Sequence, residues 1–530
     1  MTSPNQRAAS SRWAPALAGA AAGALALAAS ELVAGLVGAP SLVVSVGALA
    51  IDFQPPGAKD IVVSLFGTND KAALIVFITM LAIALAAVAG ILAARRFSLG
   101  AAVFVVFGAV AAGAAARSPL IDPVLAVVNA AIAVVTGLVT LRFLLHRLTV
   151  RPNVPVSPPS GETPGFEPQA ASAEWTRRRF LIASAGTIGV AAVAGGIGRG
   201  LIDAQHVEGV VSTSSLPKPL MAVAPLAPDQ VLTTPGLTPL VVPNDAFYRI
   251  DTALLVPRVD VATWQLKVTG MVDHPLTFTY DELLTMPLYE QYVTISCVSN
   301  RVGENLVGNA LWTGVRLKDV LEAAGVQQGA SQVVGRSVDG FTAGFPTSWA
   351  MAPEREAMIA VGMNREPLPA KHGFPARLIV PGLYGYVSAT KWLSEIELTT
   401  REAVDGYWVP LGWAKDAPIL TQSRIDLPRA GAGIAPGPVD VAGVAWAPDR
   451  GVAGVEVRID DGPWHQARIT RPISKATWVQ WTFPWTAAGS GRHGIEVRAT
   501  DDTGDVQTDE VSDPAPDGAR GHHRIFVDVG

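Results

Sequence analysis

Long unbroken runs of apolar residues dominate the first two fifths of the chain. Four of them lie near Trp13–Val37, Ala72–Ala93, Phe97–Ala115 and Val124–Leu145. Each run is about as long as a helix must be to cross a bilayer. Four such runs in succession are not typical of buried helices in a soluble domain. The pattern therefore predicts an all-α, four-helix transmembrane region over residues 1–148.

The charges between these runs predict their orientation. Arginines gather on one side of the runs, at Arg7 and Arg12, at Arg95 and Arg96, and at Arg142, Arg147 and Arg151. The connection on the other side after the first run is acidic, and the one after the third run carries a single arginine, Arg117. Because positively charged loops stay in the cytoplasm, the N-terminus and the stretch after the fourth run are expected there.

A fifth apolar run follows a polar stretch. Residues 149–176 are rich in Pro, Ser and Gly, which is the composition of a flexible cytoplasmic linker. The run "RRRFLIASAGTIGVAAVAGGIGRGLI" then predicts a fifth transmembrane helix over residues 177–205, which delivers the rest of the chain to the extracytoplasmic side. Its start, "TRRRFL", resembles the twin-arginine export motif. The alternative is that these arginines only orient the helix.

Ionisable groups are nearly absent from the membrane runs. Glu31 is the exception, and of the eight histidines only His146 and His206 lie near the runs, each at an end. Haem b in a helical bundle needs paired axial histidines, and a transport pathway needs polar groups inside the membrane. The sequence therefore predicts no haem, disfavours a transporter, and favours a bundle that anchors the protein or docks a partner.

Short strands and helices separated by turn residues begin after Leu216. Four elements are expected: strands at 264–272 and 292–298, and helices at 279–287 and 316–326. The mixture predicts an α+β domain over residues 216–415.

Residues 417–530 contain only short strands and turns. This predicts an immunoglobulin-like β-sandwich without its disulfide. Five tryptophans are expected to pack in and around its core: Trp446, Trp464, Trp478, Trp481 and Trp485.

Composition narrows the functional classes. The chain is 49% hydrophobic and 16% charged with a net charge of −5, and no basic run alternates with aromatic residues. Nucleic-acid binding is therefore not expected. Cys297 is the one cysteine in 530 residues, so it forms no intramolecular disulfide. It is either a small buried apolar side chain or a thiolate that attacks a substrate or binds a soft metal.

The motifs around Cys297 resemble the molybdopterin-binding domain of the sulfite oxidase family. They are "CVSNR", "WTGVRLKDVL", "VGRSVDGFTAGFP", "HGFPARLIVPG" and the following "KW", with "PNDAFYRID" upstream, and they span about residues 240–410. The resemblance implies a molybdenum-molybdopterin cofactor and a catalytic oxidoreductase domain. It also implies that the C-terminal domain is of the dimerisation type, which allows a homodimer.

The resemblance assigns a role to each matching residue. Cys297 is the metal ligand, since a soft thiolate suits molybdenum. Arg301, four residues later, is expected to face the substrate side as a catalytic residue; the alternative is a structural ion pair. The residues expected to bind the cofactor are Asn244, Tyr248, Arg249, Ser337, His372, Arg377, Ala389, Thr390 and Lys391. Taken singly, each has an ordinary alternative as a solvated charge or a turn residue; the ordered set favours the cofactor.

Two departures from the family pattern bear on function. Trp413 stands where sulfite oxidases of animals and plants place a tyrosine near the metal, with Tyr407 somewhat earlier. No cytochrome b5 module and no C-x-x-C-H motif is present, so electrons are expected to pass to or from a separate partner.

The sequence thus predicts a multi-pass membrane protein with an extracytoplasmic molybdenum enzyme that performs two-electron oxygen-atom transfer on a small, sulfur-containing substrate. One alternative is an S- or N-oxide reductase of the same fold. The other is a membrane-anchored binding protein without cofactor, which the joint presence of Cys297, Arg377 and Lys391 disfavours.

Overall fold

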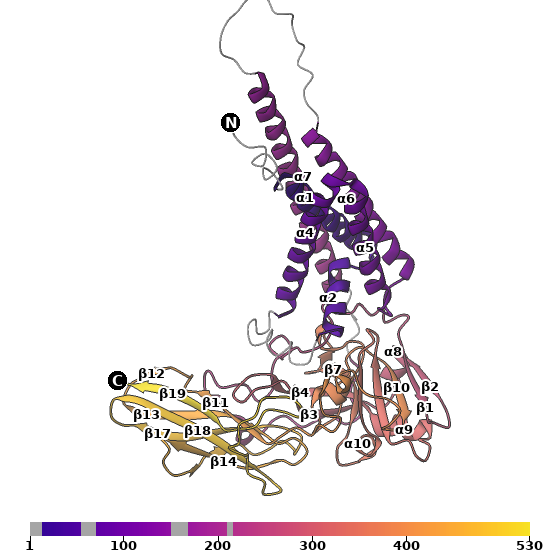
Figure 1. Cartoon of the computed structure of the whole chain (residues 1–530). Coiled ribbons are helices and arrows are strands. Elements are labelled where there is room, and N and C mark those ends of the chain that lie inside the picture. Colours follow the sequence, from indigo (N-terminus) through magenta and orange to yellow (C-terminus); the bar gives the residue numbers. More distant parts are fainter. Residues whose placement is uncertain (1–12, 55–69, 150–167, 209–215) are drawn as a thin grey trace, which may run out of the picture. The chain divides into compact units, whose positions relative to one another are not determined.

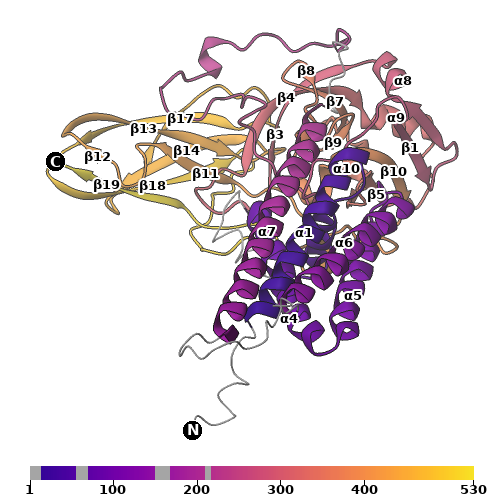
Figure 2. The same cartoon turned by 90° about the horizontal axis from the view of Figure 1, so that it is seen from above.

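The structure is a computed structural model that describes residues 13–54, 70–149, 168–208 and 216–530. It divides into two compact units (Figures 1 and 2). One unit holds the N-terminal helices with residues 252–255, and the other holds residues 209–251 and 256–530.

Helices are the regular elements of the first unit in its described residues. Its helices are α1 (Trp13–Val37), α2 (Leu42–Asp52), α4 (Asp70–Arg95), α5 (Phe97–Ala116), α6 (Pro123–Thr149) and α7 (Pro168–Glu208). Five of these, all except α2, are long and apolar enough to cross a membrane. The five helices that the apolar runs predict are therefore present. Helix α2 was not expected, and α7 begins inside the stretch assigned to the linker because residues 168–176 continue its helical turns.

Small residues let the helices of this unit approach closely. A methyl group on Gly19 of α1 would lie 2.1 Å from the carbonyl oxygen of Ala86 in α4, and one on Gly90 would lie 2.1 Å from that of Pro15. Where no hydrophobic effect drives association between helices, such backbone contact supplies the packing energy. Helices α1 and α4 are therefore joined backbone to backbone.

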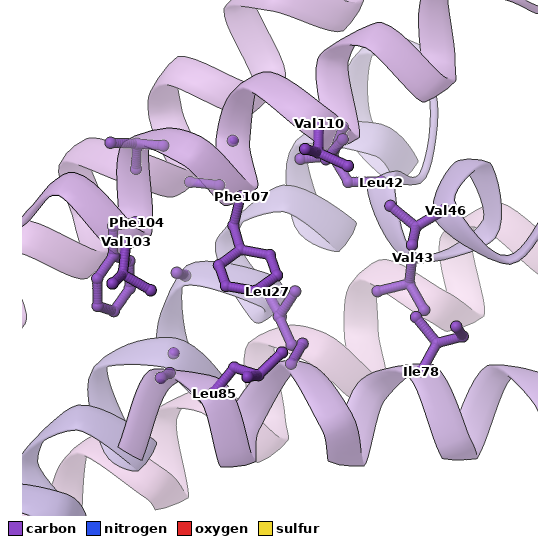
Figure 3. A pocket seen from close by; sticks show the side chains of 18 of the residues that line it. Leu27, Leu42, Val43, Val46, Ile78, Leu85, Val103, Phe104, Phe107 and Val110 are labelled. Atoms are coloured by element: carbon purple, nitrogen blue, oxygen red, sulfur yellow. The ribbon is translucent and has the colours of Figure 1, made fainter. Parts of the chain in front are cut away.

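An apolar cavity of about 180 Å³ lies among α1, α2, α4, α5 and α6 (Figure 3). Leu27, Leu85 and Phe107 are among its walls. The polar groups of this region lie at the start of α2 instead: the Ser41 hydroxyl accepts from the Val44 N–H at 3.2 Å and donates to Glu31 Oε1 at 2.5 Å. Glu31 thus has a local partner at the α1–α2 turn.

The catalytic part of the second unit is the α+β domain that the sequence predicts. It contains two sheets, in the orders β3-β4-β7-β8 with β9 on β7, and β2-β1-β10-β5-β6. Its strands are β1 (Gln265–Gly270), β2 (Leu276–Thr279), β3 (Tyr289–Ser296), β4 (Val307–Arg316), β5 (Gln332–Ser337), β6 (Thr342–Pro346), β7 (Met358–Met363), β8 (Glu366–Pro367), β9 (Arg377–Ile379) and β10 (Leu393–Thr399). Its helices are α8 (Tyr280–Thr285), α9 (Leu317–Ala324), α10 (Thr347–Met351) and α11 (Gly385–Ser388), with single turns η3 (Pro228–Gln230), η4 (Ala370–His372) and η5 (Val409–Leu411).

Local chemistry explains where two of these helices begin and end. The Thr279 hydroxyl accepts from the Glu282 N–H while the Glu282 carboxylate accepts from the Thr279 N–H, which is the reciprocal cap of a helix start. Helix α9 ends at Gly325, whose φ of 69° is the left-handed conformation that favours glycine. Both helices and the strands β1 and β3 confirm the four expected elements.

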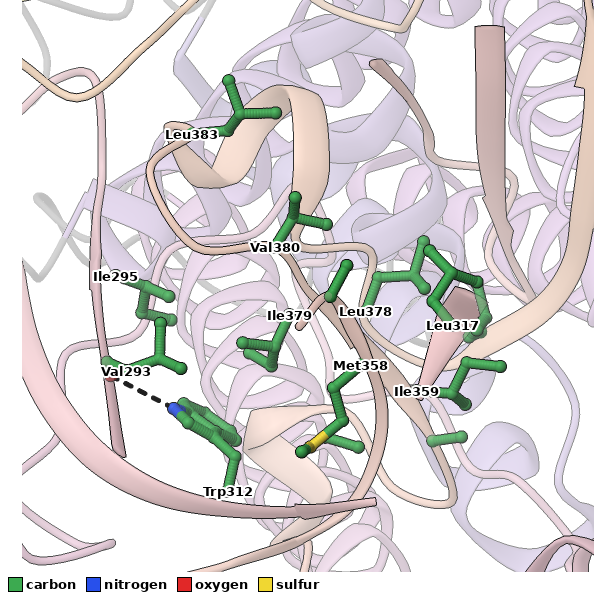
Figure 4. Packing of buried hydrophobic residues seen from close by; sticks show 14 of the residues in the cluster. Val293, Ile295, Trp312, Leu317, Met358, Ile359, Leu378, Ile379, Val380 and Leu383 are labelled. Carbon is green, nitrogen blue, oxygen red and sulfur yellow. Dashed lines mark hydrogen bonds between the residues drawn. The ribbon is translucent and has the colours of Figure 1, made fainter. Parts of the chain in front are cut away.

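The core of this domain lies where the β3-β4-β7 sheet meets β9 (Figure 4). Trp312 of β4 is fully buried there, and its indole N–H donates to the Val293 carbonyl at 3.2 Å. Val293, Leu378 and Met358 belong to the same cluster. A large aromatic side chain therefore fixes β9, which begins at Arg377, against β3, which ends at Ser296.

Two sheets make up the C-terminal part, in the orders β11-β13-β17-β16 and β12-β19-β18-β14-β15. Their strands are β11 (Gln422–Leu427), β12 (Gly433–Ile434), β13 (Gly437–Trp446), β14 (Val452–Ile459), β15 (His465–Gln466), β16 (Arg468–Ile469), β17 (Val479–Ala487), β18 (Gly491–Asp501) and β19 (His523–Val529). The β-rich character is confirmed, and the immunoglobulin-like topology stays a prediction.

The five tryptophans of this part have three different environments. Trp481 lies in the core between its two sheets and Trp485 packs at the edge of that core. Trp446 and Trp478 instead belong to the core of the catalytic domain, so their assignment to the sandwich interior was wrong. Trp464 stacks between Arg458 and Arg498, 4.6 and 4.3 Å from its ring centre.

The C-terminal part is joined to the catalytic domain by buried hydrogen bonds. The indole N–H of Trp478 donates to the Leu240 carbonyl at 2.8 Å, and its backbone N–H donates to the Thr294 hydroxyl of β3 at 2.8 Å. Arg424 donates to the Glu304 carbonyl at 2.9 Å. Trp478 thus holds strand β3, and Arg424 holds the loop that follows it.

We expect Trp312→Ala to lower the free energy of unfolding of the second unit by about 3–5 kcal/mol, the usual loss for a fully buried large aromatic residue. The measurement is denaturant unfolding of the detergent-solubilised protein, followed by circular dichroism. Trp485→Ala, at a part-exposed position, is the control and should lose less. Equal losses would contradict the central place given to Trp312.

The candidate site around Cys297

Cys297 directly follows β3, at the point where the sheet pairing with β4 ends. Its N–H donates to the Leu306 carbonyl at 2.9 Å, and its carbonyl accepts from the Asn300 N–H at 3.1 Å. The Asn300 side chain closes the loop by accepting from the Leu306 N–H at 2.7 Å. The thiol is buried, with 8% of the residue exposed. The loop therefore holds the sulfur in one position without any disulfide.

Two tyrosines interact electrostatically with the thiol. Burial is the main cause that raises the pKa of Tyr248 and of Tyr384 above the usual range, and the charge of the Cys297 thiolate raises both further. The Arg377 guanidinium acts on Tyr248 in the opposite direction. Tyr248 thus lies near both Cys297 and Arg377, and both phenols remain protonated and able to donate.

Arg377 is a buried cation at the start of β9. The residue is 2% exposed, its Nη1 donates to the His372 carbonyl at 3.0 Å, and its guanidinium lies 5.0 Å from the ring centre of Trp312. Burial lowers its pKa to about 10, so it is still charged at pH 7. Among the described residues its buried Nε has no hydrogen-bond acceptor. The site therefore contains a charged donor that the protein alone does not satisfy.

His372 supplies the complementary acceptor. Its Nε2 donates to the Asn244 carbonyl at 2.8 Å, which leaves Nδ1 without a proton. Burial lowers the pKa of this fully buried histidine to about 3, so the ring is neutral at pH 7. Within the described part of the chain, the buried Nδ1 meets no donor. A pterin ring carries both donors and acceptors, and Arg377 and His372 together match that chemistry.

A second group of charges surrounds Asp251. Its carboxylate accepts from Lys391 Nζ at 2.9 Å and from Arg249 Nε at 2.9 Å. Burial lowers the pKa of Lys391 to about 8. Arg377 lies near enough to interact electrostatically with Asp251. Three cations thus face two carboxyl groups, Asp251 and Asp339, and burial raises the pKa of Asp339. Such an excess of positive charge suits an anionic group such as a phosphate.

Glycines allow the segment before Lys391 to pack tightly. A methyl group on Gly335 would lie 2.5 Å from the Thr390 hydroxyl, and one on Gly373, at a φ of 112°, would lie 3.0 Å from the Lys391 Cβ. Ala389 ends α11 with its N–H donating to the Gly385 carbonyl at 2.9 Å. The tripeptide Ala389–Lys391 is therefore brought beside β5 and the turn of His372.

Ser337 ends β5 in the same neighbourhood, and an acid beside it was missed. The Ser337 hydroxyl accepts from the Asp339 N–H at 3.4 Å. Burial raises the pKa of Asp339, and the nearby Asp251 carboxylate raises it further. Its place in "RSVDGF", two residues after Ser337, was the available signal.

Asn244 acts in the structure mainly through other protein groups. Its side-chain NH₂ donates to Met363 O at 3.2 Å and to Glu366 at 2.9 Å, and its Oδ1 accepts from Asn364 at 2.8 Å. Its carbonyl fixes the His372 ring. A direct contact of its side chain with the cofactor stays a prediction.

Arg301 lies apart from the cofactor-binding group, in the loop after Cys297. Its Nη1 donates to Asp513 of the C-terminal part at 2.7 Å, and its side chain is 44% exposed. The same part contributes Arg520, which pairs with Asp517 at 2.6 Å. The charges of Asp517 and Arg520 act on Tyr384, as does that of Cys297. Sequence reasoning missed this loop; its signal was the acids and arginine in "DPAPDGARG", before the last strand.

The segment that replaces the family's tyrosine forms an aromatic cluster. The ring centre of Trp413 lies 5.8 Å from that of Tyr386 and 6.4 Å from that of Trp408. The ring centres of Tyr407 and Trp408 are 5.1 Å apart. The Tyr386 hydroxyl donates to the Ala414 carbonyl at 2.5 Å. The tyrosines whose electrostatic interaction with Cys297 is resolved, Tyr248 and Tyr384, thus come from other segments.

The residues present fit a molybdenum-pterin group. A buried thiol, an unsatisfied donor on Arg377, an unsatisfied acceptor on His372 and an excess of cations near Asp251 are brought together by one domain. An unpaired polar group in a protein interior is costly unless a ligand satisfies it. The constellation therefore favours a bound cofactor over a cofactor-free fold.

Comparisons with known proteins agree with this reading. Residues 253–408 match the family model of the oxidoreductase molybdopterin-binding domain. Mitochondrial sulfite oxidase of Homo sapiens is 31% identical over 331 residues, which cover 54% of this chain and 60% of that protein. The uncharacterized oxidoreductase YuiH of Bacillus subtilis is 36% identical over 154 residues, 29% of this chain and 74% of that protein.

Among solved structures, the sulfane dehydrogenase SoxCD from Paracoccus pantotrophus matches with a TM-score of 0.49 and 23% identity, over 55% of this chain and 82% of that one. The chain spans about 60% of the length of the mammalian sulfite oxidases that it matches. The matched segment contains Cys297, His372, Arg377 and Lys391. The chain belongs to the sulfite oxidase family of molybdopterin-dependent oxidoreductases.

Proposed function

We propose that this protein is a membrane-anchored molybdenum enzyme that transfers an oxygen atom to or from a small substrate outside the cytoplasm. The observation that carries the proposal is the unsatisfied, buried donor of Arg377 and acceptor of His372 in the same site as the Cys297 thiol. Oxidation of the substrate would take the oxygen from water and release two electrons and two protons. Reduction would consume the same electrons and protons and release water.

Different residues of the chain would hold the metal and the pterin. When bound, the cofactor supplies a molybdenum centre capable of two-electron redox chemistry and oxygen-atom transfer. Cys297 provides the soft thiolate ligand, and its backbone hydrogen bonds to Leu306 and Asn300 orient the sulfur. Arg377 donates to the pterin and His372 accepts from it.

The remaining cations and phenols complete the site. Lys391 and Arg249 would hold the anionic end of the cofactor, since with Arg377 they place three cations beside the two carboxyl groups of Asp251 and Asp339. Tyr248 and Tyr384 keep their protons beside the thiolate. They therefore offer hydroxyl donors to an oxygen atom of the substrate.

The membrane assignment rests on the five long apolar helices and on the arginines at their ends. With no haem-binding motif in the sequence, electrons would travel to or from a separate redox protein. An S- or N-oxide reductase is the second candidate. It is favoured by Trp413 at the family's tyrosine position and by the ion pairs of Arg301 and Arg520.

Cys297→Ser should abolish most of the activity, by about 100-fold or more, because a hard hydroxyl replaces a soft thiolate at the metal. The test measures molybdenum per chain and turnover on the purified protein. Val302→Ser, which adds a hydroxyl to the same loop, is the matched control. Full activity of Cys297→Ser would refute the assignment of the metal ligand.

Arg377→Gln should release the cofactor, because the variant loses both a charged donor and part of the positive charge that the cofactor's anionic end requires. Pterin fluorescence and elemental analysis after purification report the loss. Arg401→Gln removes an arginine that pairs with the exposed Asp416 and should retain the cofactor. Retention by Arg377→Gln would show that the guanidinium serves only the fold.

Reporter fusions should place Gly530 outside the cytoplasm and the 152–175 stretch inside it, as the distribution of arginines requires. An alkaline phosphatase fusion, active only outside, tests the first point, and a fluorescent protein tests the second. A cytoplasmic Gly530 would overturn the proposed location of the enzyme.

A further inference from the structure

The loop between β18 and β19 brings two carboxylates to the neighbourhood of Cys297. Ser512 and Arg520 are bridged as an antiparallel pair, which closes the loop. Gly518 packs on the Tyr384 phenol so closely that a methyl group there would lie 2.6 Å from the hydroxyl oxygen. A methyl group on Gly385, the residue after Tyr384, would lie 3.7 Å from the carbonyl oxygen of Ser296, which precedes Cys297. The loop therefore lies near the candidate metal site.

Both of these carboxylates, Asp513 and Asp517, pair with an arginine. Asp513 accepts from Arg301 at 2.7 Å, and Asp517 accepts from Arg520 at 2.6 Å. Arg301 lies four residues after Cys297, and Arg520 lies two residues after Gly518, which packs on Tyr384. We take these two arginines as the cations of the substrate entrance. The charge of Arg301 is cancelled by Asp513 of the C-terminal part, and that of Arg520 by Asp517 of the same loop.

The cofactor side has the opposite balance. There Arg249 and Lys391 pair with Asp251, Arg377 interacts with it electrostatically, and Asp339 is the second carboxyl group nearby. The protein thus keeps an excess of positive charge where it binds an anionic cofactor, and a balance of charge at the entrance. Within a Debye length of about 8 Å, the net charge decides whether an anion is attracted.

We propose that Asp513 and Asp517 determine the substrate class of the enzyme, by keeping its entrance neutral so that it accepts an uncharged substrate, an S-oxide or the corresponding sulfide, in preference to an oxyanion. The proposal rests on the function proposed above. An oxyanion needs unpaired charged donors for tight binding. Here it would have to displace a carboxylate from each arginine, whereas a neutral oxide needs only single hydrogen bonds from Arg301, Arg520 or Tyr384.

Sulfate binding to the complete, detergent-solubilised holoenzyme tests the proposal with a probe that does not react. Calorimetry at low salt should find weak binding to the wild type, and about tenfold tighter binding to Asp513→Asn and to Asp517→Asn, because each change frees an arginine. The gain should vanish at high salt. Asp509→Asn removes the same charge from the same loop without freeing either arginine, and should bind sulfate like the wild type.

Kinetics give a second readout. The ratio of kcat/KM for sulfite to that for dimethyl sulfoxide should rise about tenfold in both variants, and should stay at the wild-type value in Asp513→Glu, which restores the ion pair. Asp513 is 79% exposed, so Asp513→Asn folds and is decisive even if Asp517→Asn does not.

Tight sulfate binding by the wild type, unchanged in Asp513→Asn, would overturn the inference. So would the same gain in Asp509→Asn, since it would reflect overall charge. These outcomes are distinct from failure of the proposed function, which would show as a wild-type protein that contains no molybdenum.

Discussion

A buried guanidinium without a carboxylate is the constraint around which the catalytic domain is organised. Arg377 is 2% exposed and forms no ion pair among the described residues. Burial of a charge in that state is costly, so the surrounding structure must hold it until a ligand arrives. Trp312 lies beneath it, the His372 carbonyl accepts one hydrogen bond, and the Tyr248 phenol lies near. The rigidity of the core thus serves a group whose Nε the described residues leave unsatisfied.

The C-terminal part belongs to the catalytic machinery as much as to the architecture. Trp446 and Trp478 fill the core of the neighbouring domain, and Arg424 holds the backbone of the Cys297 loop. The loop with Asp513 and Asp517 reaches the thiol's surroundings. A region that the family resemblance assigns to dimerisation therefore also contributes residues to the surroundings of the site.

Much of the fold and part of the site could be predicted from sequence, for identifiable reasons. An apolar run long enough to cross a bilayer has few possible structures other than a helix, so the five long helices were predicted correctly. The reciprocal cap of Thr279 and the glycine at 325 are local signals, so α8 and α9 were found as well. The motifs that include Cys297 identified the molybdopterin-binding domain, which the family model matches over residues 253–408, while the roles of the single residues stay predictions.

What could not be predicted depends on contacts between distant segments. Nothing local indicates that Trp478 donates to Leu240 or that Asp513 pairs with Arg301, because each pair joins segments about two hundred residues apart. The start of α7 at Pro168 was missed because Pro and Ser in its first turns resemble a linker in composition. Asp339 was overlooked because its neighbour Ser337 occupied the expected position, and only burial reveals the acid.

The hydrogen bonds of Trp478 have a consequence for the order of events during biosynthesis. Strand β3 and Leu240 receive hydrogen bonds from Trp478, which is synthesised more than 180 residues after Thr294. A ribosome that has completed the family motifs has therefore not yet produced a finished pocket. Cofactor insertion is expected to follow the synthesis of Trp478, and a chain truncated near residue 417 would present the insertion machinery with an open core.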